Sequence, residues 1–129
     1  MRRYNWSFAE LCDRLTIVSQ KIVYSETAEM KQSFIGERED IIHDINLFLK
    51  EGVQVDGSVI YLICCLQLVN ATIWNNESAF REGGNGGNLP FTHGLNSNRA
   101  EIKKAISQKA NGRIDYKLNY NSGIWDLSL

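Results

Sequence analysis

The stretch Val59–Val69, with the sequence VIYLICCLQLV, constrains the fold of this 129-residue chain more than any other segment. Its apolar side chains fall on nearly every side of a helical projection, whereas a surface helix alternates an apolar and a polar face. The apolar run is shorter than the roughly 20 residues that a membrane-spanning helix requires. It therefore predicts a buried, central helix over about 59–82.

The start of the chain predicts another helix. Ser7–Glu10 has the sequence of a capping box, and Trp6 and Leu11 are spaced to form a hydrophobic staple around it. Apolar residues then recur every three or four positions as far as Ile22, which is the period of a helix. We expect this helix to end near residue 24.

Two more helices follow from the same period. One is expected over about 28–51, where Gly36 leaves a break in the helix open. The other is expected to begin at Pro90, because the first turn of a helix does not need the missing amide of proline, and to end near Ala110. The GGNGG sequence of residues 83–87 connects the two later helices.

The last segment has a different pattern. RIDYKLNY, residues 113–120, alternates apolar and polar side chains, and IWDLSL follows a glycine-containing turn. Two short alternating runs around such a turn predict a β-hairpin over about 113–129. The expected fold is mainly α: a single domain (1–129) with a four-helix antiparallel bundle (about 7–110) and a C-terminal β-hairpin, packed on its own bundle or on another chain.

Composition excludes several classes of protein. A hydrophobic fraction of 43% and a net charge of −1 are those of a folded globular domain rather than a disordered chain. Residues 90–129 carry six basic and three acidic residues, too weak an excess for duplex DNA binding. The three cysteines, Cys12, Cys64 and Cys65, fit neither a disulfide framework nor zinc spacing. We interpret them as small buried apolar residues in a reducing cytoplasm, and expect no membrane association.

Few residues have the spacing of a catalytic or metal site. Glu37, Asp40 and Asp44 could share one helical face as metal ligands, but a charged stretch of this kind is usually solvated. Arg38 and His43 match the Arg-x4-His spacing of the helical HEPN ribonucleases. Neither pattern is specific, and we expect a protein without metal, cofactor or catalytic residues.

Polar and aromatic residues give a better candidate site. Arginine binds carboxylate or phosphate through a planar fork, and tryptophan supplies a surface for stacking a base. Asn70, Trp74 and Arg81 lie on one predicted helical stripe. The complete set of candidate ligand-binding residues is Arg14, Lys21, Asn70, Trp74, Arg81, His93, Asn98, Arg99 and Lys103.

Three segments also resemble a known sequence pattern: ELCDRLTIVSQKI (10–22), LQLVNATIWNNESAFRE (66–82) and LNSNRAEIKKAI (95–106). They are similar to a family of small helical bacterial and phage proteins without an established activity. The resemblance covers about half of the chain and excludes the glycine-rich loop and the predicted hairpin. Where the family has Glu-Asp after its tryptophan, this chain has Glu77-Ser78. The matching positions are Asp13, Arg14, Thr16, Lys21, Asn70, Trp74, Glu77, Arg81, Asn98, Arg99 and Lys103.

These observations predict a non-enzymatic, cytoplasmic protein that binds a small anionic ligand, foremost a nucleotide or a nucleotide-derived signal, and that forms a homodimer or larger oligomer. If the chain is viral, which the distribution of the family permits, it would sequester a host immune signal. Two alternatives remain open. One is an adaptor or inhibitor that binds another protein through the hairpin edge. The other is a HEPN-like ribonuclease that uses His43 or His93.

Overall fold

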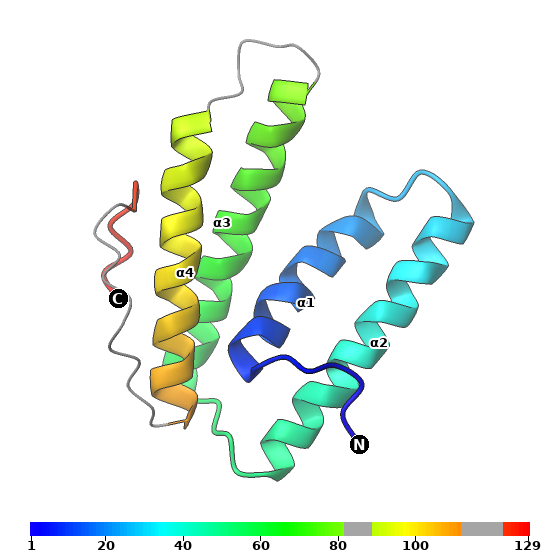
Figure 1. Ribbon diagram of the computed structural model, residues 1–129, viewed down its shortest axis with the longest axis vertical. Helices are drawn as coiled ribbons and strands as arrows, with labels where there is room; N and C mark the ends of the chain where they lie inside the picture. Colours follow the sequence, from blue (N-terminus) through cyan, green and yellow to red (C-terminus); the bar gives the residue numbers. More distant parts are fainter. Residues whose placement is uncertain (82–88, 112–122) are drawn as a thin grey trace.

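Four α-helices form the regular structure in the computed structural model, which describes residues 1–81, 89–111 and 123–129 (Figure 1). The helices are α1 (Phe8–Val23), α2 (Ala28–Lys50), α3 (Gly57–Arg81) and α4 (Leu89–Asn111). All four predicted helices are thus confirmed, with ends close to those expected. The second helix continues through Gly36 without a break.

Side-chain caps set the starts of three helices. The Ser7 hydroxyl accepts from the amide of Glu10 at 3.1 Å, and Thr27 caps α2 in the same way through the amide of Met30. The Asp56 carboxylate accepts from the amide of Val59 at 3.0 Å at the start of α3. Each cap satisfies an amide that has no partner within its own helix.

The helices form two antiparallel pairs, α1 with α2 and α3 with α4 (Figure 1). α1 also packs against α3 and α4, whereas α2 packs on α1 alone among the described helices. The bundle is therefore a three-helix unit of α1, α3 and α4, with α2 on the outer side of α1. Polar residues on the inner side of α1 consequently face two other helices.

Two apolar clusters hold this arrangement together. The main cluster joins α3 and α4 to the start of α1, and a smaller one joins α1 to α2. Complete burial of a Leu or Ile side chain contributes roughly 1.5–3 kcal/mol each. The main cluster contains Phe8, Val59, Leu62, Leu66, Val69, Leu95, Ile102 and Ile106, and the smaller one contains Leu11, Val18 and Ile41.

The first residues of the chain are fixed to α2. The buried carboxylate of Asp44 accepts from the backbone amides of Arg3 and Tyr4, at 2.8 Å each, and lies 3.0 Å from Nδ1 of His43. Trp6 packs on the cluster that contains Leu11, as the predicted staple requires. Asp44 is thus a structural anchor for the N-terminal segment.

The predicted C-terminal β-hairpin is wrong. Residues 123–129 contain no strand, and the first half of the prediction falls on residues 112–122, outside the described part of the chain. The apolar residues of IWDLSL are used differently: Trp125 and Leu127 pack on the main core cluster. The alternation of apolar and polar residues here therefore indicates a segment with one side packed against the helices, and not a pair of strands.

α3 is less buried than its composition predicts. Ile60, Tyr61 and Leu68 are each more than half exposed, and Cys64 is exposed as well, contrary to the prediction for all three cysteines. The reason is geometric, because among the described helices only α1 and α4 pack against α3. By length and composition alone Gly57–Ser78 could cross a membrane, a test that the core helix of a soluble protein also meets.

Two leucines on α3 test the assignment of its inner and outer sides. Leu66 is fully buried and Leu68 is 57% exposed. We expect Leu66→Ala to lower the free energy of unfolding by about 2–5 kcal/mol, because it leaves a cavity in the main cluster. Leu68→Ala should change it by less than about 0.5 kcal/mol. Denaturant titrations of both variants measure the difference, and equal losses would contradict the assignment.

Candidate functional site

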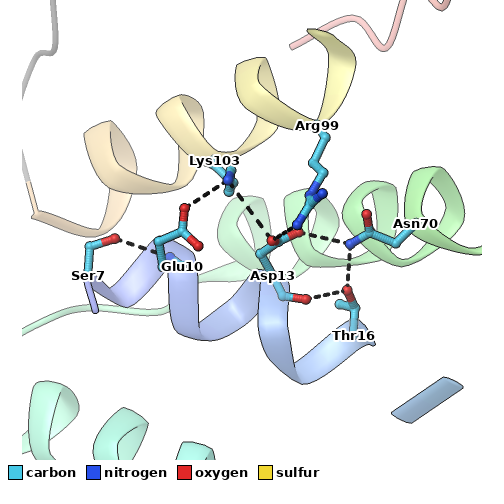
Figure 2. Close-up of polar contacts among 7 residues, drawn as sticks. All are labelled: Ser7, Glu10, Asp13, Thr16, Asn70, Arg99 and Lys103. Atoms are coloured by element: carbon cyan, nitrogen blue, oxygen red, sulfur yellow. Dashed lines mark hydrogen bonds and ion pairs between the residues drawn. The ribbon is translucent and has the colours of Figure 1, made fainter. Parts of the chain in front are cut away.

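The carboxylate of Asp13 joins the three inner helices. It comes from α1 and is fully buried. Arg99 of α4 donates to it through Nε at 2.8 Å and through Nη2, and Asn70 of α3 donates to Oδ1 at 2.9 Å (Figure 2). The Asn70 amide also donates to the hydroxyl of Thr16, which itself donates to the carbonyl of Asp13. The buried charge of Asp13 is thus satisfied by hydrogen bonds from side chains of two neighbouring helices.

Lys103 extends this network by one helical turn. Its Nζ donates to the carboxylate of Glu10 at 2.8 Å and lies 4.0 Å from Oδ2 of Asp13. Figure 2 shows Arg99 and Lys103 reaching together from α4 onto α1. Glu10 therefore does not close the predicted capping box with Ser7, because its carboxylate binds Lys103.

The network shifts the pKa values of both members of its central pair. Burial alone would raise the pKa of Asp13, but the hydrogen bonds from Arg99 and Asn70 and the nearby positive charges outweigh it and lower that pKa. The hydrogen bond to Asp13 raises the pKa of Arg99. Both groups are therefore charged at neutral pH, and each neutralises the other.

Four of the predicted cations do not converge on a free anion site. Arg99 and Lys103 are paired with Asp13 and Glu10. The guanidinium of Arg14 is exposed and lies 5.1 Å from the centre of the Trp6 ring, and Nζ of Lys21 lies 5.5 Å from that of Phe34. The structure thus brings Asn70, Arg99 and Lys103 together but leaves Arg14 and Lys21 apart from them.

The remaining candidates have other surroundings. Asn98 is fully buried, but its amide binds the backbone of Trp125 on the C-terminal segment. His93 is exposed near the start of α4. Arg81 ends α3, and its side chain lies outside the described part, as does the GGNGG loop. The part of Arg81 in the predicted ligand-binding set therefore stays a prediction.

Two adjacent cavities flank Trp74. The first, about 230 Å³, lies between α1 and α3, and the second, about 170 Å³, lies between α1, α3 and α4. Trp74 and Gln20 line both cavities. The first is otherwise lined by Ser19, Val23, Tyr24, Gln67, Ala71 and Asn75, and the second by Ile17, Asn70, Ile73, Glu77, Asn96 and Arg99. We call the two cavities together the Trp74 groove.

Gln20 is the unusual residue of the Trp74 groove. Its side chain is only 7% exposed, and its Nε2 atom is buried without a hydrogen-bond acceptor among the described residues. Buried amide groups nearly always have a partner, since losing one costs about 1–3 kcal/mol. Gln20 is therefore the polar residue of the Trp74 groove that the described part of the chain leaves without a partner.

Aromatic rings form one wall of the Trp74 groove. Tyr24 stacks on Trp74 with 5.9 Å between ring centroids and 18° between planes. Tyr24 remains 59% exposed, so the pair forms an apolar edge at the surface and is not part of the core. The groove thus combines a flat apolar wall with the amides of Gln20, Gln67, Asn70, Asn75 and Asn96.

The sequence interpretation missed Asp13, Thr16 and Gln20 as site residues. Their spacing of three and four places them on one side of α1, and all three are buried. The sequence pattern that indicates these residues is a polar side chain at each turn of an otherwise apolar helical stripe. Such a stripe needs partners from other helices, and here Asn70 and Arg99 supply them.

The alternative sites gain no support from the geometry. Arg38 pairs with the neighbouring Glu39, and His43 contacts Asp44, so this arginine and histidine are not brought together within one chain. Asp40 binds Arg3, and within the described ranges no group of three His, Cys, Asp or Glu residues could hold a metal ion.

Comparison of the chain with protein families, with curated proteins and with solved structures finds no match. The resemblance to the small bacterial and phage proteins accordingly stays a hypothesis. Several residues that carry it, Asp13, Thr16, Asn70, Arg99 and Lys103, belong to the network in Figure 2. A structural role in joining helices is therefore sufficient to account for their pattern.

Removing the charge of Asp13 tests the network. Asp13→Asn leaves the partly buried Arg99 without its carboxylate, and we expect the free energy of unfolding to fall by about 2–4 kcal/mol. Asp40→Asn is the matched control, because its ion pair with Arg3 is exposed and should contribute at most about 1 kcal/mol. Urea denaturation at pH 7 measures both. A smaller loss for Asp13→Asn than for Asp40→Asn would refute the central role of Asp13.

Acid should weaken the same network. The pKa values of Asp13 and Asp44 lie below their ordinary values in the folded chain, so both carboxyls contribute stability above the unfolded value of about 3.9. That contribution is lost as the pH falls through the lower, folded pKa. We expect the free energy of unfolding to decrease below about pH 4, with a shallower decrease in Asp13→Asn. Identical pH profiles would contradict the lowered pKa of Asp13.

Proposed function

We propose that this chain binds a small planar ligand of the nucleoside or nucleotide class in the Trp74 groove. The observation that carries the proposal is the Gln20 carboxamide, whose Nε2 is buried without an acceptor in the described part of the chain. Gln20 also lines both cavities. Because Nε2 is itself buried, a ligand would reach it once the Gln20 side chain turns toward the groove, where a carbonyl oxygen or ring nitrogen would supply the missing acceptor.

The energetics of Gln20 favour a binding role over a structural one. An apolar side chain of similar size would fill the same space without the cost of an unpaired donor. Binding sites commonly retain such a cost, because the group is satisfied only when the ligand is present. The same unpaired donor discriminates against ligands that lack an acceptor.

The aromatic wall suits a ring system. Trp74 lines both cavities and Tyr24 extends its apolar edge. Stacking of a base on an aromatic side chain contributes about 1–3 kcal/mol. Amides along the groove, from Gln67, Asn75 and Asn96, are suited to the hydrogen-bonding edges of a base or sugar.

The charge balance favours the base over the phosphates as the recognised part. Glu77 lines the second cavity, and Asp13 lies beside it, bound to both Arg99 and Asn70. Arg99 already gives two of its donors to Asp13. A triphosphate would be placed next to these carboxylates. We therefore expect nucleosides and monophosphates to bind more tightly than the corresponding triphosphates.

The proposed activity is binding without chemical conversion. Amides and an indole carry it, and these groups orient a ligand but do not exchange protons near neutral pH. Asp13, the buried acid next to the groove, is held ionised by Arg99 and Asn70. It therefore serves to position those two side chains.

Thermal unfolding with a panel of ligands tests the proposal. Nucleobases, nucleosides, monophosphates, cyclic nucleotides and triphosphates are each added in millimolar excess. A ligand at a hundredfold excess over its Kd stabilises the fold by about 2.7 kcal/mol, which is a readily measured rise in Tm. No rise with any member of the panel would contradict the proposed function.

Gln20→Leu locates the site. The substitution removes the unpaired donor, so we expect it to raise the free energy of unfolding of the unliganded protein by about 1 kcal/mol and to abolish the ligand-dependent rise in Tm. Gln32→Leu is the matched control, because Gln32 is exposed on α2 and should alter neither quantity. A full ligand effect in Gln20→Leu would place the binding site elsewhere.

A further inference from the structure

The segment Gly123–Leu129 packs on α3 and α4, on the side of α4 away from α1 (Figure 1), and we call the surface that it covers the groove. Its backbone is held by a side chain: Nδ2 of Asn98 donates to the carbonyl of Trp125 at 2.8 Å, and the amide of Trp125 donates to Oδ1 of Asn98 at 3.0 Å. One side chain thus satisfies both the amide and the carbonyl of Trp125. Asn98 is thereby completely buried.

Side-chain fit adds selectivity to the backbone contact. A Cβ atom at Gly94 would overlap Cγ1 of Ile124, and one at Gly123 would come within 2.6 Å of Nδ2 of Asn98. Glycine at both positions therefore permits the close approach of the segment to α4. Trp125 and Leu127 pack on the main core cluster, and the hydroxyl of Tyr61 donates to the carbonyl of Leu127 at 3.3 Å.

These contacts hold the Gly123–Leu129 segment of the chain against α3 and α4. They run from the segment to Tyr61, Gly94, Asn98 and the core below, all of them on or between α3 and α4. A second copy of the chain carries the same segment, and it would make every one of these contacts unchanged. An empty groove would leave the Asn98 amide and part of the apolar core open to water, which favours refilling.

We propose that this groove accepts the Gly123–Leu129 segment of a second copy, so that two chains associate by exchanging it. The contacts are equal in both arrangements, and the difference lies in the concentration of the segment near the groove. The chain's own segment is favoured in dilute solution, and exchange is favoured as the protein concentration rises. The residues that hold the exchanged segment, Tyr61, Gly94 and Asn98, do not line the Trp74 groove.

Two full-length variants separate the groove from the segment that fills it. Trp125→Asp places a charge on the core and undocks the segment while the groove stays intact. Gly94→Leu fills the space of Ile124 and blocks the groove while the segment stays intact. We expect each variant alone to be monomeric at 100 μM by light scattering. Their equimolar mixture should form a heterodimer, with the segment of the Gly94→Leu chain in the groove of the Trp125→Asp chain.

A synthetic peptide of residues 123–129 completes the test. It should bind the Trp125→Asp chain, should not bind the Gly94→Leu chain, and should dissociate the heterodimer. Circular dichroism of each variant checks that the helices are retained, and Ile124→Asp replaces Trp125→Asp if they are not. A mixture that stays monomeric while both variants remain helical overturns the proposal, even if the peptide binds.

Discussion

A single buried charge, that of Asp13, fixes how three of the helices meet. An ionised carboxylate removed from water requires partners, and those available come from α3 and α4. Apolar packing alone would allow helices to slide or rotate with little loss, because side chains of similar size can replace one another. The bidentate contact with Arg99 allows far less freedom. The main apolar cluster holds α1, α3 and α4 together, and the Asp13 contacts set their relative positions within it.

The Trp74 groove is a consequence of that arrangement. Asp13, Thr16 and Gln20 follow one another along the same side of α1, and the first two find partners on α3 and α4. Gln20 lies one turn further, where cavities replace the contacts. The same stripe of side chains thus passes from a satisfied network to an unsatisfied amide. The Asp13 network and the proposed binding site therefore lie next to each other on the same side of α1.

How much of this structure can be predicted from the sequence depends on how far apart the interacting residues lie along the chain. The four helices could be found because their signals are local: the Ser7 cap, the apolar period and the turn at Pro90. The pairing of Arg99 with Asp13 spans 86 positions and could not be read from spacing. For the same reason the sequence did not reveal that Arg99 and Lys103 of the predicted ligand-binding set are paired with carboxylates of α1. The hairpin prediction was wrong because the alternating apolar residues of IWDLSL, Trp125 and Leu127, pack on the helical core.

The peripheral position of α2 has a consequence for motion. α2 packs on α1 alone among the described helices, through the small cluster around Leu11 and Ile41 and through Phe48 on Phe8. Asp44 binds the N-terminal segment to it. Local opening follows the elements with the fewest buried contacts. The amide hydrogens of α2 should therefore exchange with solvent through a partial opening that leaves the other three helices protected. Such an opening would uncover the outer side of α1 and leave the Asp13 network intact.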